Sequence, residues 1–262
     1  MKTFLKTLNI LILIISIAAC STKKTSDELV VGTCTGFPPY EMLNKNGDFE
    51  GFDIDVAQAL AKQLGKKLVL KDMGFDALIL AVNQGKIDCA MAGMSITETR
   101  KSEVAMIHYQ GHALTHLPML FWERIPEGVT TVEDLKKLPH PTVCAQVDSL
   151  QAEVVAQYDF LTLKHLENIP DLIMDIKYGK SIATVLEPMV VEALQQENPH
   201  LKILNIPLKP AQQSFGHGIV INKNNISLIA TVEKAIQELK NDGTIAALEA
   251  KWFTKGASHG DK

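Results

Sequence analysis

The sequence has little of what nucleic-acid-binding and metal-binding proteins need. Its 262 residues include 26 lysines and arginines against 30 acidic residues, a net charge of −4, and only 6% are aromatic. There is no basic run and no interleaving of basic with aromatic residues, which argues against a nucleic-acid partner. The four cysteines lack the close spacing of metal ligands, so we expect no metal and no other cofactor.

The amino terminus has the pattern of a targeting signal. Lys2 and Lys6 precede the apolar run Leu8–Ala19, which is too short to span a bilayer. The run leads into Cys20 with a small-small-cysteine ending that resembles the bacterial lipobox. We therefore expect residues 1–19 to be a lipoprotein signal peptide and Cys20 to carry a lipid anchor. An ordinary cleaved signal peptide or a short anchor is the alternative.

Three further cysteines, Cys34, Cys89 and Cys144, lie in or beside segments that resemble strands. Buried free thiols are the default expectation for such an odd set. A bridge between Cys34 and Cys89 stays open if their two strands are neighbours.

From Glu28 onward, strand and helix patterns alternate in two successive sets, which predicts two α/β lobes with mostly parallel sheets and a hinge between them. The closing helices have no sheet of their own and are expected to return to the first lobe. The predicted domains are a tether at 20–27, lobe 1 at 28–116 and 214–255, and lobe 2 at 117–213. The predicted strands are 29–32, 67–71, 87–91, 117–122, 142–145, 161–166, 181–186, 201–206 and 215–221. The predicted helices are 52–64, 75–84, 132–138, 149–158, 171–178, 188–196, 226–243 and 244–253.

The stretch from Gly93 to Arg100 is typical of an anion-binding turn. Gly93 allows a tight turn after a buried strand, and Thr97 is a candidate helix N-cap. Arg100 then falls in the first helical turn, where its charge opposes the helix macrodipole unless an anion lies beside it. Together with the Ser95 hydroxyl and free helix N–H groups, its guanidinium could hold a carboxylate. The alternative is a surface arginine paired with a nearby glutamate.

Other candidate residues also follow strands, and ligands of open α/β sheets bind at the carboxyl ends of strands. Each has a plainer interpretation on its own: the phenylalanines as core residues, and Asp148, Ser149 and Glu187 as helix caps. Because all of them lie at the carboxyl ends of the predicted strands, on one edge of two facing units, a binding site is the better interpretation. These candidates are Phe37, Phe75, Ser95 and Arg100 in the first unit, and 146–149 and Glu187 in the second.

Several motifs together resemble the polar amino-acid-binding proteins of bacterial ABC importers, solute-binding family 3. The resemblance covers essentially all of residues 28–253, and Glu187 with the two phenylalanines is most similar to the arginine-binding branch. The motifs are Val31-Gly32-Thr33, Phe37-Pro38-Pro39-Tyr40-Glu41, Gly51-Phe52-Asp53-Ile54-Asp55, Phe75-Asp76-Ala77-Leu78-Ile79, Ile87-Asp88, Ser95-Ile96-Thr97 with Arg100, Asp242-Gly243-Thr244 and Lys251-Trp252-Phe253.

This resemblance implies a type II periplasmic-binding-protein fold that closes by hinge bending around a free amino acid. Arg100 would bind the α-carboxylate, Glu187 and the Gly93 carbonyl would bind the α-ammonium, and Phe37 and Phe75 would sandwich the ligand side chain. Two aromatic faces suit a planar cation. The positions that complete the implied ligand site are Met94, Ser95, Asp148, Ser149 and Gln151.

Two positions depart from the family pattern. Cys34 stands where an aspartate often contacts basic ligand side chains, and Asp148 stands where a glycine usually precedes Ser149. Our hypothesis is that Asp148, or as second choice Glu41, supplies the carboxylate for the distal cation of the ligand.

The expected function is therefore non-enzymatic capture of a basic amino acid, arginine first, for the membrane permease of an ABC importer. The protein is expected to be a monomer, anchored by lipid in the periplasm or at the cell surface. A dehydratase-like enzyme on the same fold is one alternative, and a sensor or surface adhesin is another. Acid–base chemistry for the enzyme would have to come from His108, His112, His116, His165 or His217.

Overall fold

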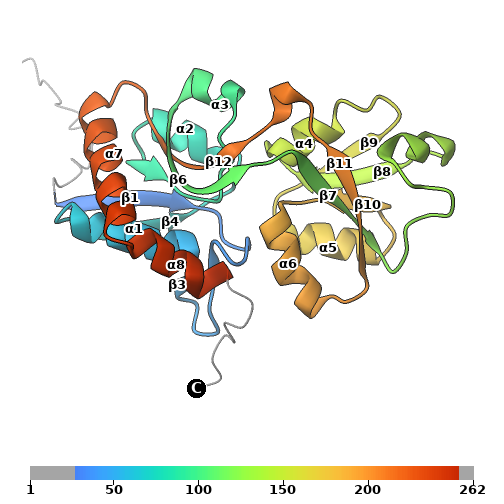
Figure 1. Ribbon diagram of the computed structural model, residues 1–262, viewed down its shortest axis with the longest axis horizontal. Coiled ribbons are helices and arrows are strands. Elements are labelled where there is room, and N and C mark those ends of the chain that lie inside the picture. The colour runs from blue at the N-terminus through green and yellow to red at the C-terminus, as the bar shows by residue number, and fades with distance from the viewer. Residues whose placement is uncertain (1–26, 254–262) are drawn as a thin grey trace, which may run out of the picture.

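The computed structural model describes residues 27–253, which form two lobes joined by two chain crossings (Figure 1). The predicted signal peptide, the lipid-attachment residue Cys20 and most of the tether lie outside the described residues. Within 27–253, none of the helices combines the length and the apolar character that a membrane crossing requires.

Lobe 1 is built on a five-stranded sheet with the order β4-β1-β5-β12-β6. The strand β1 pairs in parallel with β4 and β5, while β12 pairs antiparallel with β5 and β6. The strands are β1 (Glu28–Thr33), β4 (Lys67–Asp72), β5 (Cys89–Ala90), β6 (Ala105–Ala113) and β12 (Phe215–Ile221).

Lobe 2 repeats this plan with the order β11-β7-β10-β8-β9. Here β8 pairs in parallel with β9 and β10, while β7 pairs antiparallel with β10 and β11. The strands are β7 (His116–Trp122), β8 (Thr142–Gln146), β9 (Thr162–Leu166), β10 (Ala183–Val185) and β11 (Leu201–Pro207).

Both sheets have four strands in one direction and one in the other. The reversed strand is the one that enters from the opposite lobe, β12 in lobe 1 and β7 in lobe 2. A strand that enters from the other lobe joins the sheet at the edge where the neighbouring strands have their carboxyl ends. It must therefore run antiparallel to them. The hinge segments thus lie at the carboxyl edge of both sheets, where ligands of open α/β sheets bind.

The strand β6 was not predicted, although polar residues occupy every second position at His108, Gln110 and His112, which is the alternation expected of a half-buried strand. The helix predicted at 132–138 is a 3₁₀ helix, Val132–Lys137 (η1), which begins with a capping box between Thr131 and Asp134.

Helices cover both sheets, and the two closing helices pack on lobe 1 beside α1 (Figure 1). A short hairpin of β2 (Met42–Leu43) and β3 (Phe49–Glu50) precedes α1. The helices of lobe 1 are α1 (Phe52–Gln63), α2 (Ala77–Asn83), α3 (Glu98–Glu103), α7 (Ile226–Asn241) and α8 (Thr244–Phe253). Lobe 2 has α4 (Leu150–Val155), α5 (Ile169–Lys177) and α6 (Pro188–Glu197), and the 3₁₀ helix Pro210–Gln212 (η2) precedes β12.

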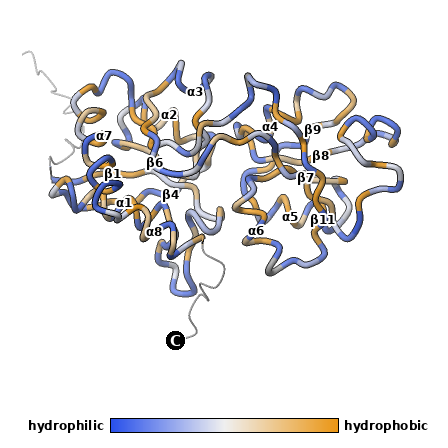
Figure 2. The backbone as a smooth tube through the Cα atoms, viewed as in Figure 1, coloured by the Kyte–Doolittle hydropathy of each residue, from blue (hydrophilic) through white to orange (hydrophobic). Residues whose placement is uncertain are grey.

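The core follows from the apolar strands. Leu29, Val30 and Val31 are all buried although they alternate between the two faces of β1, as expected for a strand that is covered on both sides. Figure 2 shows hydrophobic segments running through the interior of each lobe and hydrophilic segments on the outer turns. Cys34, Cys89 and Cys144 are buried, and none of the three forms a disulfide with another described residue, so Cys34 and Cys89 are not bridged.

Candidate functional site: a closed cavity between the lobes

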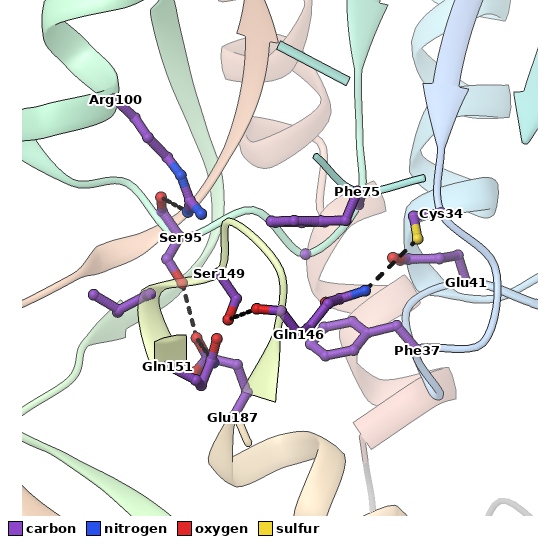
Figure 3. A pocket seen from close by; sticks show the side chains of 13 residues that line it. Cys34, Phe37, Glu41, Phe75, Ser95, Arg100, Gln146, Ser149, Gln151 and Glu187 are labelled. Atoms are coloured by element: carbon purple, nitrogen blue, oxygen red, sulfur yellow. Dashed lines mark hydrogen bonds between the residues drawn. The ribbon is translucent and has the colours of Figure 1, made fainter. Parts of the chain in front are cut away.

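A cavity lies between the two lobes (Figure 3). Both lobes contribute to its walls through residues that follow strands or begin helices. Eight of the ten predicted ligand-site residues line it, and Met94 and Asp148 do not. The lining residues are Cys34, Phe37, Glu41, Phe75, Ala92, Gly93, Ser95, Arg100, Gln146, Ser149, Leu150, Gln151 and Glu187.

Arg100 is fixed by the turn that precedes α3. The Thr97 side chain caps this helix by accepting a hydrogen bond from the Arg100 backbone N–H, with a distance of 3.2 Å. The Arg100 side chain is buried, so its interpretation as a surface arginine is wrong. Its Nη1 donates to the Ser95 carbonyl at 2.8 Å, and its Nη2 donates to the Asp148 carbonyl of the other lobe at 2.9 Å.

The Arg100 guanidinium keeps donors free for a ligand. A guanidinium carries five N–H donors, and two of them are used by these carbonyls. Burial lowers the pKa of Arg100, and the Coulombic attraction of Glu153 and Glu187 opposes that change. Arginine stays protonated in proteins, so the cavity holds a fixed positive charge. The guanidinium carbon also lies 5.5 Å from the centre of the Phe75 ring.

Glu187 supplies the opposite charge from lobe 2. Pro188 occupies the first turn of α6 and leaves Glu187 at the N-cap position, yet the Glu187 side chain makes no capping hydrogen bond. Instead, its Oε1 accepts from Ser95 Oγ of lobe 1 at 2.8 Å and from Gln151 Nε2 at 3.2 Å. Burial raises the pKa of Glu187 to about 7, against the opposing effects of Ser95 and Arg100. Such a carboxylate would be stabilised by a cation.

Phe37 and Phe75 lie on opposite sides of the space in the view of Figure 3. Phe37 packs so closely on the turn after β5 that a Cβ at Gly93 would lie 2.5 Å from its Cε1 atom. Gly93 also has a φ of +51°, so both the close approach and the backbone require glycine there.

The far end of the cavity from Arg100 is formed by Cys34, Glu41 and Gln146 (Figure 3). Gln146 Nε2 donates to the Glu167 carbonyl at 2.9 Å and lies 3.8 Å from Cys34 Sγ of the other lobe. Burial raises the pKa of the Cys34 thiol to about 11, so it is a neutral group at this end.

Glu41 is the acid at this end. It is 1% exposed, and among the described residues its Oε2 is one of two buried side-chain oxygens that have no hydrogen-bond partner. Burial raises its pKa well above the usual value, and Asp53 adds to the shift. Asp53 is already engaged, because it accepts from the Gly93 N–H and the Tyr109 hydroxyl, both at 2.7 Å. Glu41 is thus a buried acid that lacks a cation.

Asp148 and Met94 lie elsewhere. The Asp148 side chain is exposed and faces an outer groove, and only its backbone carbonyl reaches Arg100. This corrects the hypothesis that the Asp148 carboxylate faces the distal group of the ligand; the second choice, Glu41, lines the cavity. Met94 is buried in the core of lobe 1 beneath the turn and lines the same outer groove.

The histidines proposed for the enzyme alternative do not line the cavity. His217 is buried, with its Nδ1 2.9 Å from Gln110 Oε1, and burial lowers its pKa to about 3, so it is neutral. His108, His112, His116 and His165 are exposed. Within residues 27–253 no cluster of histidine, cysteine and acidic side chains could hold a metal ion.

Two lining residues, Ala92 and Leu150, were not among the candidates from the sequence. Gln146 was among them, as a polar residue at the end of a strand within the range 146–149. Ala92 and Leu150 are small or apolar and had no signal beyond their position.

Comparisons with known proteins bear on the family and the fold of the chain. A sequence model of the bacterial extracellular solute-binding proteins, family 3, matches residues 29–255. A probable ABC transporter arginine-binding protein, ArtJ, from Chlamydia trachomatis serovar D is 33% identical over 87% of this chain and 86% of its own length. Structures of an ancestral arginine-binding protein bound to arginine and to glutamine are 32% and 33% identical, with TM-scores of 0.77 and 0.78. Each match covers 87% of this chain and 99% of the chain in the solved structure.

Proposed function

Because the chain belongs to the bacterial extracellular solute-binding proteins, family 3, we propose that it captures a free basic amino acid, arginine first, for an ABC importer. Its named relatives are amino-acid-binding proteins of ABC transporters rather than enzymes. The two-lobed fold with a hinge suits capture by closure of the lobes.

The observation that carries the proposal is a pair of opposite charges at one end of a buried cavity. Arg100 comes from lobe 1, and Glu187 comes from lobe 2. A zwitterionic amino acid placed between them would present its carboxylate to Arg100 and its ammonium to Glu187. Ser149 and Gln151, at the start of α4, supply further polar groups at this end.

The other end of the cavity favours a cationic side chain. Phe37 and Phe75 offer aromatic faces, and each face contributes about 0.5–2 kcal/mol to binding a desolvated cation. Glu41 has an unpartnered buried oxygen beyond them. A planar guanidinium would donate to this oxygen and favour the ionised form of Glu41, whereas the neutral amide of glutamine would bring no charge that stabilises the carboxylate.

Calorimetric titration with arginine, lysine, ornithine, histidine and glutamine tests the ligand. We expect arginine to bind most tightly. Glu41→Gln should weaken arginine binding by about 2–5 kcal/mol, because it removes one partner of a buried charge pair, and should leave glutamine binding unchanged or tighter. Glu233→Gln on the exposed face of α7 is the matched control. Arginine binding no tighter than glutamine binding, or unchanged by Glu41→Gln, would contradict the proposal.

The location follows from the sequence alone. The protein is secreted through the signal at 1–19 and held at the periplasmic or outer face of a membrane by a lipid on Cys20. Replacing the lipidated cysteine should move the protein from the membrane fraction to the soluble fraction. Fractionation of cells that express the Cys20→Ser protein measures this change. An unaltered membrane fraction would mean that an uncleaved anchor holds it.

A further inference from the structure

Asp148 combines an uncommon backbone conformation with an exposed side chain, whose charge attracts the Arg100 guanidinium without a hydrogen bond to it. Its φ is +55°, a region that non-glycine residues rarely adopt. The side chain is exposed, and the structure gives it no hydrogen bond that would explain this conformation. Strained backbone persists where the surrounding structure determines it, and such strain is found near functional sites.

The conformation places the Asp148 carbonyl at the cleft. This carbonyl accepts a hydrogen bond of 2.9 Å from Arg100 Nη2 of the other lobe. The turn is held on both sides: Ser149 Oγ donates to the Gln146 carbonyl at 2.6 Å and accepts from the Ala152 N–H at 3.1 Å. The carbonyl therefore has little freedom to move away from the guanidinium while the lobes are closed.

We propose that Asp148 is a positioning residue, whose left-handed backbone holds a carbonyl that links the ligand-binding Arg100 to lobe 2. Arg100 is then bonded to its own lobe through the Ser95 carbonyl and to the other lobe through Asp148. These two bonds orient the guanidinium plane and leave three N–H donors for a carboxylate. One side chain thus both binds the ligand and joins the lobes.

The link exists only in the closed form, because its two partners lie on different lobes. When the lobes open, Arg100 Nη2 and the Asp148 carbonyl each bond to water instead of to each other. The backbone at residue 148 is then free to relax. Its main effect is therefore on opening, which controls ligand release, rather than on encounter with the ligand. The ligand part of this inference rests on the proposed function; the effect on closure of the unliganded protein does not.

Substitutions at position 148 distinguish the effect of the backbone carbonyl from the effect of the side-chain carboxylate. Glycine and asparagine adopt positive φ readily, so Asp148→Gly and Asp148→Asn should preserve the link although both remove the charge. Alanine tolerates this conformation less well, and valine hardly at all. Asp148→Ala should thus have an intermediate effect, and it keeps the test valid if Asp148→Val folds poorly.

Stopped-flow kinetics with arginine and small-angle X-ray scattering of the unliganded protein measure the two effects. We expect Asp148→Val to raise the dissociation rate roughly 5- to 30-fold, as the cost of a left-handed backbone implies, with the association rate nearly unchanged. Its unliganded form should be more open. The glycine and asparagine variants should match the wild type in both measurements.

Three results would overturn the inference. The first is wild-type behaviour of both Asp148→Val and Asp148→Ala. The second is an equal loss of binding in all four variants, which would assign the effect to the carboxylate. The third concerns Arg100→Ala, in which the link is already absent: a further opening of that protein by Asp148→Val would place the effect elsewhere. If no amino acid binds, the proposed function fails, while the scattering comparison still tests the link.

Discussion

Lobe 1 and lobe 2 contribute different kinds of groups to the cavity. Lobe 1 provides both aromatic rings, the acid Glu41 and the guanidinium of Arg100, which its own Ser95 carbonyl and Thr97 cap already hold in place. Lobe 2 provides Glu187 and small polar groups at helix starts. One lobe therefore presents most of the recognition surface, and the other completes it on closure.

The two lobes also show how a binding acid differs from a structural one. Asp175 in lobe 2 is also a buried acid, though less deeply buried than Glu41 and Glu187, and Lys164 Nζ lies 2.6 Å from its Oδ1. Burial raises the pKa of Asp175, and the hydrogen bonds from Lys164 and Ser181 outweigh burial, so that the pKa falls below its usual value. Glu187 has no such cation in direct contact, and its pKa is raised. Glu187 and Glu41 are buried acids that line the cavity without a cation of the described residues in contact, which is the kind of perturbed group found at functional sites.

The largest effect that tests this comparison is expected from Arg100→Ala. If lobe 1 holds the carboxylate, amino-acid binding should weaken by about 2–5 kcal/mol, since the substitution leaves a buried carboxylate unpaired. Calorimetry measures the loss, and thermal unfolding of the unliganded protein should change much less. Lys101→Ala, at the exposed neighbour on α3, is the control. Intact binding with a large loss of unliganded stability would show that Arg100 is structural.

A smaller effect is expected from pH and sharpens the role of lobe 2. With a pKa of about 7 in the ligand-free protein, Glu187 holds a proton in mildly acidic solution. A ligand ammonium favours the charged form, so binding must release that proton below pH 7. Affinity should therefore rise with pH and level off above about 7, with a change of roughly tenfold per pH unit below it.

Calorimetry in buffers of different ionisation enthalpy counts the released protons. At about pH 6, Glu187→Gln should reduce the number released by nearly one, and any remainder would come from Glu41, whose pKa is also raised. A proton count that Glu187→Gln leaves unchanged would remove Glu187 from the ammonium site.

Much of the molecule could be predicted because its signals are local. The alternation of strands and helices depends on apolar spacing that each segment carries by itself. The capping turn from Thr97 to Arg100 and the Pro188 start of α6 likewise depend on neighbouring residues. These patterns placed Arg100 and Glu187 at strand ends before any tertiary contact was known. The strand β6 was missed although it carries a local signal of its own, because polar residues stand at every second position from His108 to His112.

By itself, the sequence determined the two-lobed α/β class and the edge on which the site lies. The tertiary structure decided which acid enters the cavity: Glu41 faces inward with an unpartnered oxygen, whereas Asp148 faces outward and offers its carbonyl. The physical reason is that the direction of a side chain depends on the backbone angle at its residue and on packing across the hinge. Contacts between residues far apart in the chain set both, and no local pattern encodes them.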